Sequence, residues 1–103
     1  MAKLDIINEQ ELNLSGHLIF ITVAAIYKDN ESYFRKLKND IKINLKQVKR
    51  VDSSALALLM SWLRFGQEQQ CKVEFINIPK QLIDLAKLSS VDKLISKSRD
   101  ELS

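Results

Sequence analysis

The sequence has very few of the residues that build disulfide or metal frameworks. Its 103 residues include one cysteine, Cys71, and one histidine, His17, which lie far apart in the chain. A lone cysteine cannot form an internal disulfide, and one cysteine with one histidine does not make a structural zinc site. We therefore expect a reduced protein without a metal centre, and we expect no cofactor.

Proline and glycine are also rare, and the net charge is small. The chain has one proline and two glycines, while 46% of its residues are hydrophobic and 28% are charged. This composition excludes collagen-like and intrinsically disordered proteins. The 16 basic and 13 acidic side chains leave a net charge of +3, which decides little about partners. We expect no nucleic-acid partner, because the sequence has no recognition helix and no RNA-binding aromatic strand motif. At this length we expect one domain over residues 1–103, with a frayed polar tail at 97–103.

Long apolar segments are missing as well. The longest uncharged apolar run covers residues 18–26, well short of the roughly 20 residues that a membrane-spanning helix needs. Residues 1–10 lack the basic start, apolar centre and cleavage site of a secretory signal. These absences predict a cytoplasmic protein without a membrane span.

The chain does contain a regular succession of strand patterns. Residues 4–6 and 12–14 alternate apolar and polar side chains, which predicts a hairpin of two strands that ends at the turn-forming Ser-Gly pair at 15–16. Residues 40–46 alternate in the same way and predict a third strand with one face in water. Residues 73–76 predict a fourth strand.

Helical patterns occupy the segments between these strands. Residues 18–23 fit a strand or a helix, and we favour a helix over 22–38. A second helix begins at or near Ser53, a third follows Pro79, and a short last one is expected at about 91–96. This order predicts an α/β domain with a mostly parallel four-stranded sheet and about four helices packed mainly on one face.

Three segments, at 12–16, 41–59 and 85–94, resemble the STAS domain family. The family includes bacterial anti-sigma factor antagonists and the STAS subunit of the Mla phospholipid transporter. Its strongest motif is a buried strand followed by Asp, Ser or Thr, Ser or Gly, Gly and Leu at the start of a helix. In this chain Ala55 stands in place of the usual glycine, and Gln70 replaces a second common glycine before the fourth strand. The resemblance covers nearly the whole chain.

The motif contains the main candidate site. The resemblance implies that Ser53 occupies the position that is phosphorylated in anti-sigma factor antagonists. A phosphate there would lie at a helix N-terminus, where free N–H groups and the helix dipole favour negative charge. The residues alone also allow a simpler interpretation, in which Asp52, Ser53 and Ser54 only cap the helix. We favour docking of a partner through this loop over phosphorylation.

The helix that follows the motif has more apolar surface than one core needs. Its two adjacent apolar stripes are Leu56, Leu59, Met60 and Leu63, and Ala55, Leu58, Trp62 and Phe65. The second stripe either packs beneath neighbouring helices or forms an interface anchored by Trp62. His17 is expected in a surface loop near the motif. The candidate partner-binding residues are therefore Asp52, Ser53, Ser54, Ala55, Leu58, His17 and Trp62.

The resemblance favours a non-enzymatic cytoplasmic STAS subunit that binds and regulates the ATPase of an Mla-type phospholipid ABC transporter, and so supports the lipid asymmetry of the outer membrane. Through this partner the protein would lie at the cytoplasmic face of the inner membrane. The alternative is an anti-sigma factor antagonist that a partner serine kinase switches by phosphorylating Ser53. An enzyme is disfavoured, because the sequence offers no paired carboxylates, no nucleophile with a base, and no glycine-rich nucleotide motif.

Overall fold

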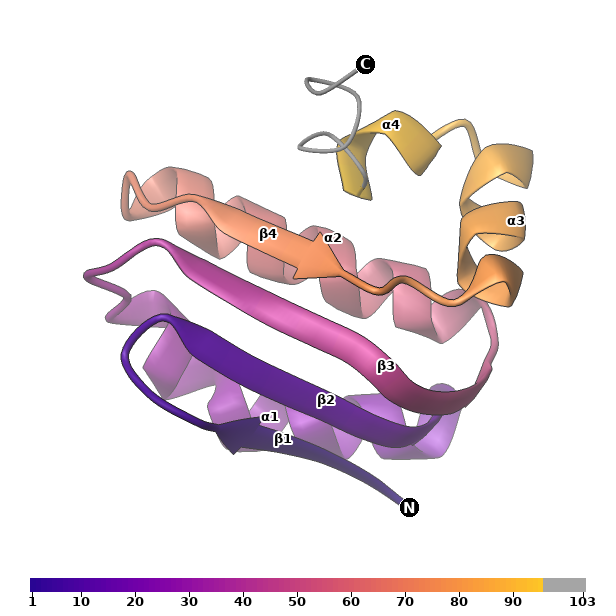
Figure 1. Ribbon diagram of the computed structural model, residues 1–103, viewed down its shortest axis with the longest axis horizontal. Helices are drawn as coiled ribbons and strands as arrows, with labels where there is room; N and C mark the ends of the chain where they lie inside the picture. The colour runs from indigo at the N-terminus through magenta and orange to yellow at the C-terminus, as the bar shows by residue number, and fades with distance from the viewer. Residues whose placement is uncertain (96–103) are drawn as a thin grey trace.

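Strands and helices follow one another along the chain in the predicted order. The computed structural model describes residues 1–95, so the expected tail at 97–103 and the end of the helix predicted at 91–96 lie outside the described residues. The elements drawn in Figure 1 are β1 (Ala2–Ile6), β2 (Glu11–Leu18), α1 (Phe20–Arg35), β3 (Ile41–Val51), α2 (Ser53–Glu68), β4 (Val73–Ile76), α3 (Lys80–Leu88) and α4 (Asp92–Ile95).

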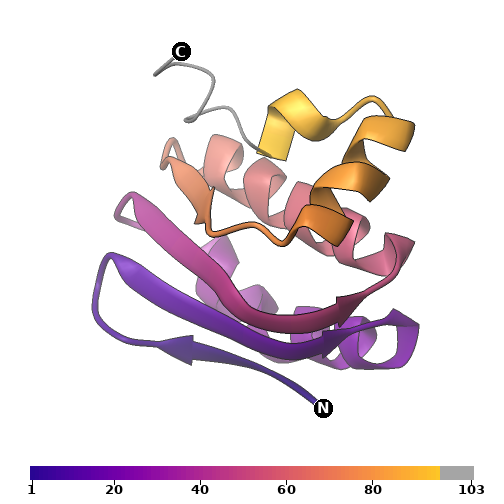
Figure 2. The same cartoon turned by 45° about the vertical axis from the view of Figure 1, so that its right-hand side comes forward.

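The strands form one four-stranded sheet in the order β1-β2-β3-β4. β1 is antiparallel to β2, whereas β2, β3 and β4 are parallel to one another. α1 and α2 cover one face of the sheet, and the described part of the chain places no helix on the other face (Figures 1 and 2). The predicted α/β class with a mostly parallel sheet is confirmed. Within residues 1–95, no helix is long and apolar enough to cross a membrane.

The side chains of β3 illustrate how the sequence pattern selects the two faces. Ile41, Ile43 and Leu45 are at most 2% exposed and belong to the core beneath the helices, together with Leu59 of α2. Lys42, between two of these residues, is exposed. Because successive side chains of a strand point to opposite faces, Lys42 lies on the bare face. The predicted strand with one wet face is confirmed.

The turn predicted at 15–16 is wrong. β2 does not end there but runs through Ser15 and Gly16 to Leu18, while residues 7–10 connect β1 to β2 within the predicted hairpin. Gly16 has a φ of +93°, and a Cβ at this position would collide with the carbonyl oxygen of Met1. The strand pairing also shifts register beside Gly16. This glycine therefore marks an irregularity within the strand, where the start of β1 passes too close for a side chain.

Several element boundaries differ from the sequence expectation, and the two that matter most for the site are the end of β3 and the start of α1. β3 continues beyond residue 46 to Val51, but Lys46 and Gln47 are both exposed, which breaks the alternation by which a strand is recognised. Leu18 still pairs with Val51 in the sheet. The helix that we favoured over 22–38 begins earlier, at Phe20, soon after β2 has ended.

Candidate functional site

Two helices begin side by side where the neighbouring strands β2 and β3 end. β2 ends at Leu18 and β3 ends at Val51, and these residues are register partners. α1 begins two residues after the first strand and α2 two residues after the second, at Phe20 and Ser53. We call this the helix-start edge. The positive dipole ends of both helices therefore meet at one place, and the first N–H groups of each helix need partners from outside its own backbone ladder.

The carboxylate of Asp52 connects the two helix starts. One of its oxygens accepts a hydrogen bond from the backbone N–H of Ser54 at 2.8 Å, and the other accepts from the backbone N–H of Phe20 at 3.1 Å. The backbone N–H of Asp52 also donates to the carbonyl oxygen of Leu18 at 3.1 Å. Asp52 is thus the cap of α2 and a second support for α1. Ser53, the first residue of α2, is left exposed.

Thr22 holds the start of α1 against the end of β2. Its hydroxyl oxygen accepts from the backbone N–H of Ile19 at 3.1 Å, and the hydroxyl donates to the carbonyl oxygen of His17. The sequence prediction missed this role, because the helix was expected to begin at Thr22 and because Ile19 is not a residue type that usually caps a helix. His17 is exposed, but it lies in β2 beside Arg50 of β3 and not in the loop that we expected.

An apolar groove runs between α1 and α2 from the helix-start edge. It has a volume of about 260 Å³ and is lined by Phe20, Val23, Ala24, Tyr27, Ser54, Ala57, Leu58 and Ser61. Phe20 and its neighbour Ile21 are 73% and 77% exposed. We call the groove together with Phe20, Ile21 and Ser53 the docking surface. The contribution of α1 was missed, because residues 18–26 were considered only as a membrane span or a core segment.

The prediction of Trp62 as an exposed interface anchor is wrong. Its side chain is fully buried, and its ring stacks on that of Phe34 in α1 with the centroids 4.6 Å apart. Ala55 is also fully buried, and Leu58, at 1% exposure, lines only the inner part of the groove. The second apolar stripe of α2 therefore packs beneath α1. Neither Trp62 nor Ala55 is available to a partner in this fold.

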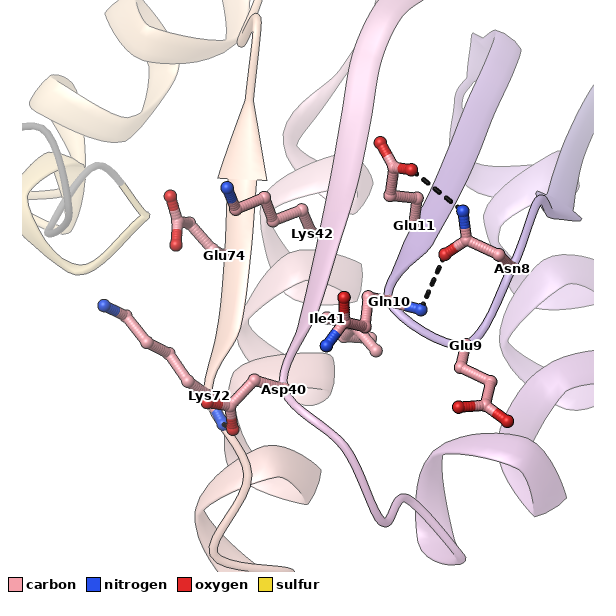
Figure 3. Close-up of a pocket in the computed structure, with 9 residues that line it drawn as sticks. All are labelled: Asn8, Glu9, Gln10, Glu11, Asp40, Ile41, Lys42, Lys72 and Glu74. Atoms are coloured by element: carbon pink, nitrogen blue, oxygen red, sulfur yellow. Dashed lines mark hydrogen bonds between the residues drawn. The ribbon is translucent and has the colours of Figure 1, made fainter.

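A second hollow lies where β3 and β4 begin, away from Ser53 (Figure 3). Lys42 of β3 stands between Glu11 of β2 and Glu74 of β4 in the register of the sheet. The carboxylate of Asp40 accepts from the backbone N–H of Lys72 at 2.8 Å. Its mixed charges give this hollow no single-sign field, and among the described residues no group suitable for a metal ion is found. We therefore place the candidate site at the docking surface.

Comparison with known proteins agrees with this geometry. A family model described as "Mlab, STAS domain" matches residues 7–96, whereas no curated protein gives a significant match. The structure resembles the anti-sigma factor antagonist SpoIIAA in its unphosphorylated form, at 15% identity over 89% of this chain and 83% of that chain, with a TM-score of 0.72. It also resembles the Bacillus cell fate determinant SpoIIAA in the phosphorylated form, at 13% identity over 100% of both chains, with a TM-score of 0.71. At these identities the likeness shows a shared fold, and the family match shows more: the chain belongs to the MlaB-like STAS domain family.

Proposed function

We propose that this protein is a non-enzymatic cytoplasmic subunit that binds and regulates the ATPase of an Mla-type phospholipid ABC transporter. STAS domains are in general regulatory modules that act by binding other proteins. The observation that carries the proposal is the exposure of Phe20 and Ile21 beside the apolar groove between α1 and α2. The match to the MlaB-like family model supports a transporter partner.

The docking surface has the properties of a protein interface. None of the described residues that line the groove is charged, and the centres of protein interfaces are depleted of charge and enriched in aromatic residues. Phe20 supplies an aromatic side chain of this kind, while Ser53 and His17 provide polar groups nearby. The positive ends of two helix dipoles at the same edge favour a carboxylate or carbonyl group on the partner.

The direct test is affinity purification of the tagged protein from native membranes, followed by mass spectrometry. We expect an ABC-type ATPase and its permease to be recovered. Phe20→Ser and Ile21→Ser should each lower recovery at least about tenfold, because both side chains are the exposed apolar part of the surface. Ile7→Ser is the matched control, since Ile7 is 55% exposed but lies in the connection between β1 and β2. Recovery of a soluble kinase without the ATPase would contradict the proposal.

A phosphorylation switch is the second candidate function, supported by the position of Ser53. This serine is exposed at the first position of α2, where the positive end of the helix dipole favours a phosphate. One of the structures with this fold is a phosphorylated form. In this alternative, the protein is an anti-sigma factor antagonist, and a partner serine kinase modifies Ser53.

Variants of Ser53 separate the effect of charge from that of shape. We expect Ser53→Asp to weaken binding of the ATPase, because it adds negative charge to the surface that docks. Ser53→Asn, neutral and of similar size, should bind nearly as well as the wild type. Phosphate on Ser53 in cells, found by mass spectrometry together with a co-purifying serine kinase, would favour the switch. Absence of that phosphate in all growth states would exclude it.

A further inference from the structure

β1 forms a free edge of the sheet. It pairs only with β2 among the strands of residues 1–95, and no helix or loop lies beyond it in either view (Figures 1 and 2). An edge strand presents a row of unpaired N–H and C=O groups to its surroundings. The opposite side of this strand is fully used by β2, from Ala2 opposite Gly16 to Ile6 opposite Leu12.

The hydrogen bonds at the two ends of β1 reveal which residues face outward. His17 donates its backbone N–H to the carbonyl oxygen of Met1, and Ile7 donates to the carbonyl oxygen of Glu11, both at 2.9 Å. Odd-numbered residues of this segment therefore direct their backbone groups toward β2. In an antiparallel ladder the alternate residues face the other way. The backbone groups of Ala2, Leu4 and Ile6 are thus the ones that an added strand would meet.

The side chains of β1 add charge complementarity to this edge. Leu4 packs against the core, so Lys3 and Asp5 lie on the bare face of the sheet. Their charged groups are 3.3 Å apart, with the Lys3 side chain 74% and the Asp5 side chain 43% exposed. If two β1 strands pair antiparallel about Leu4, Leu4 faces its own copy and Ala2 faces Ile6. In the same register each Lys3 faces the Asp5 of the other copy.

This register satisfies the backbone hydrogen bonds of the edge and pairs its opposite charges at the same time. The outward residues Ala2, Leu4 and Ile6 fall at hydrogen-bonded positions. Lys3 and Asp5 then fall at non-hydrogen-bonded positions, where facing side chains are closest. Centring the pair on Lys3 or on Asp5 instead would oppose like charges. We propose that β1 is a self-association edge at which a second copy of this chain adds antiparallel about Leu4, continuing the sheet across a twofold axis.

This dimer adds to the proposed function without depending on it. The twofold axis passes between the two facing Leu4 residues, so each strand of the second copy runs opposite to the same strand of the first. The two helix-start edges, with Phe20 and Ser53, then point to opposite ends of one continuous sheet. Two helix-start edges on one dimer can engage two partner proteins.

Strand addition over a segment of this length buries less area than a standard protein interface. We therefore expect a reversible dimer with a dissociation constant on the order of 10–100 µM. Sedimentation equilibrium on the full chain should show the mass rising from 11.9 kDa toward twice that value with concentration. A protein that stays monomeric up to about 1 mM would overturn the proposal, because it would lie well beyond that constant.

A charge swap tests the register itself. Lys3→Glu and Asp5→Lys should each dimerise at least about tenfold more weakly than the wild type, because each places like charges opposite one another. Mixed together, the two variants should form a heterodimer in which every facing pair is again of opposite sign. Lys46→Glu is the control, because it has the same net charge as Lys3→Glu but changes β3. Mixed with Asp5→Lys, it should bind at least about tenfold more weakly than Lys3→Glu does.

A backbone variant tests the edge without changing charge. Ile6→Pro removes an outward N–H and places a ring where the second strand would lie, while the bonds to β2 use the neighbouring residues. Ile6 is 53% exposed, so we expect the variant to fold and to lose dimerisation. Circular dichroism checks folding. A dimer that is unchanged by Ile6→Pro, or by both charge reversals, would use another surface and would overturn the proposal.

Discussion

Removal of the Asp52 carboxylate is the most direct test of how the site is held together. One carboxylate accepts hydrogen bonds from the starts of two helices, at Ser54 and at Phe20. Replacing an aspartate cap by alanine costs about 0.5–2 kcal/mol, and losing the second bond adds about 1 kcal/mol. We therefore expect Asp52→Ala to lower the free energy of unfolding by about 1.5–3 kcal/mol. This loss corresponds to a fall in Tm of about 6–24 °C for a domain of this size.

Asp52→Asn tests the two hydrogen bonds of the carboxylate individually. The amide keeps one oxygen, which can still accept from Ser54, but its NH₂ group faces the N–H of Phe20, and two donors cannot bond to each other. We expect a loss of about 1 kcal/mol for this variant. Backbone hydrogen exchange should become faster at Phe20 and remain slow at Ser54.

Urea unfolding followed by circular dichroism measures these losses, with an unchanged m-value as the sign that only stability has changed. Asp29→Ala is the matched control. Asp29 is exposed in the middle of α1, and we expect its replacement to change stability by less than about 0.5 kcal/mol. The double-cap argument is refuted if Asp52→Ala also stays within that limit, or if Asp52→Asn leaves hydrogen exchange at Phe20 unaltered.

Two further predictions concern the turn between α2 and β4. A Cβ at Gly66 would lie 2.7 Å from Cγ2 of Val73 and 2.8 Å from the carbonyl oxygen of Cys71, so Gly66→Ala should cost about 1–3 kcal/mol in urea unfolding; a neutral result would contradict this packing. Gln70 has a φ of +57°, and Gln70→Gly should raise stability by about 0.5–1 kcal/mol because glycine adopts this conformation without strain. A lower urea midpoint for Gln70→Gly would refute that reasoning.

The conformation of Gln70 also explains one departure from the family pattern. The resemblance places a common glycine at this position, and the structure has a left-handed backbone there. The sequence keeps the turn while placing a side chain on it. The other departure, Ala55, is accommodated in the core, where it is fully buried in the first turn of α2. Neither substitution disturbs the fold.

Sequence patterns recovered those parts of the fold that depend on local periodicity. The alternation of Ile41, Ile43 and Leu45 predicted both the strand and its buried face, and the polar residues from Asp52 predicted the start of α2. The same reasoning failed at Gly16, because a glycine within a strand and a glycine in a turn have the same local signature. It also missed the second half of β3, where a register shift interrupts the alternation.

The sequence by itself determined the order of elements, the faces of the strands and the presence of the capping motif, because each depends on residues that are near one another in the chain. Only the tertiary structure decided that Asp52 also supports Phe20, that Trp62 is covered by Phe34, and that the exposed apolar surface lies on α1 beside Ser53. These contacts join residues far apart in sequence. They depend on β2 and β3 ending side by side, which no local pattern records.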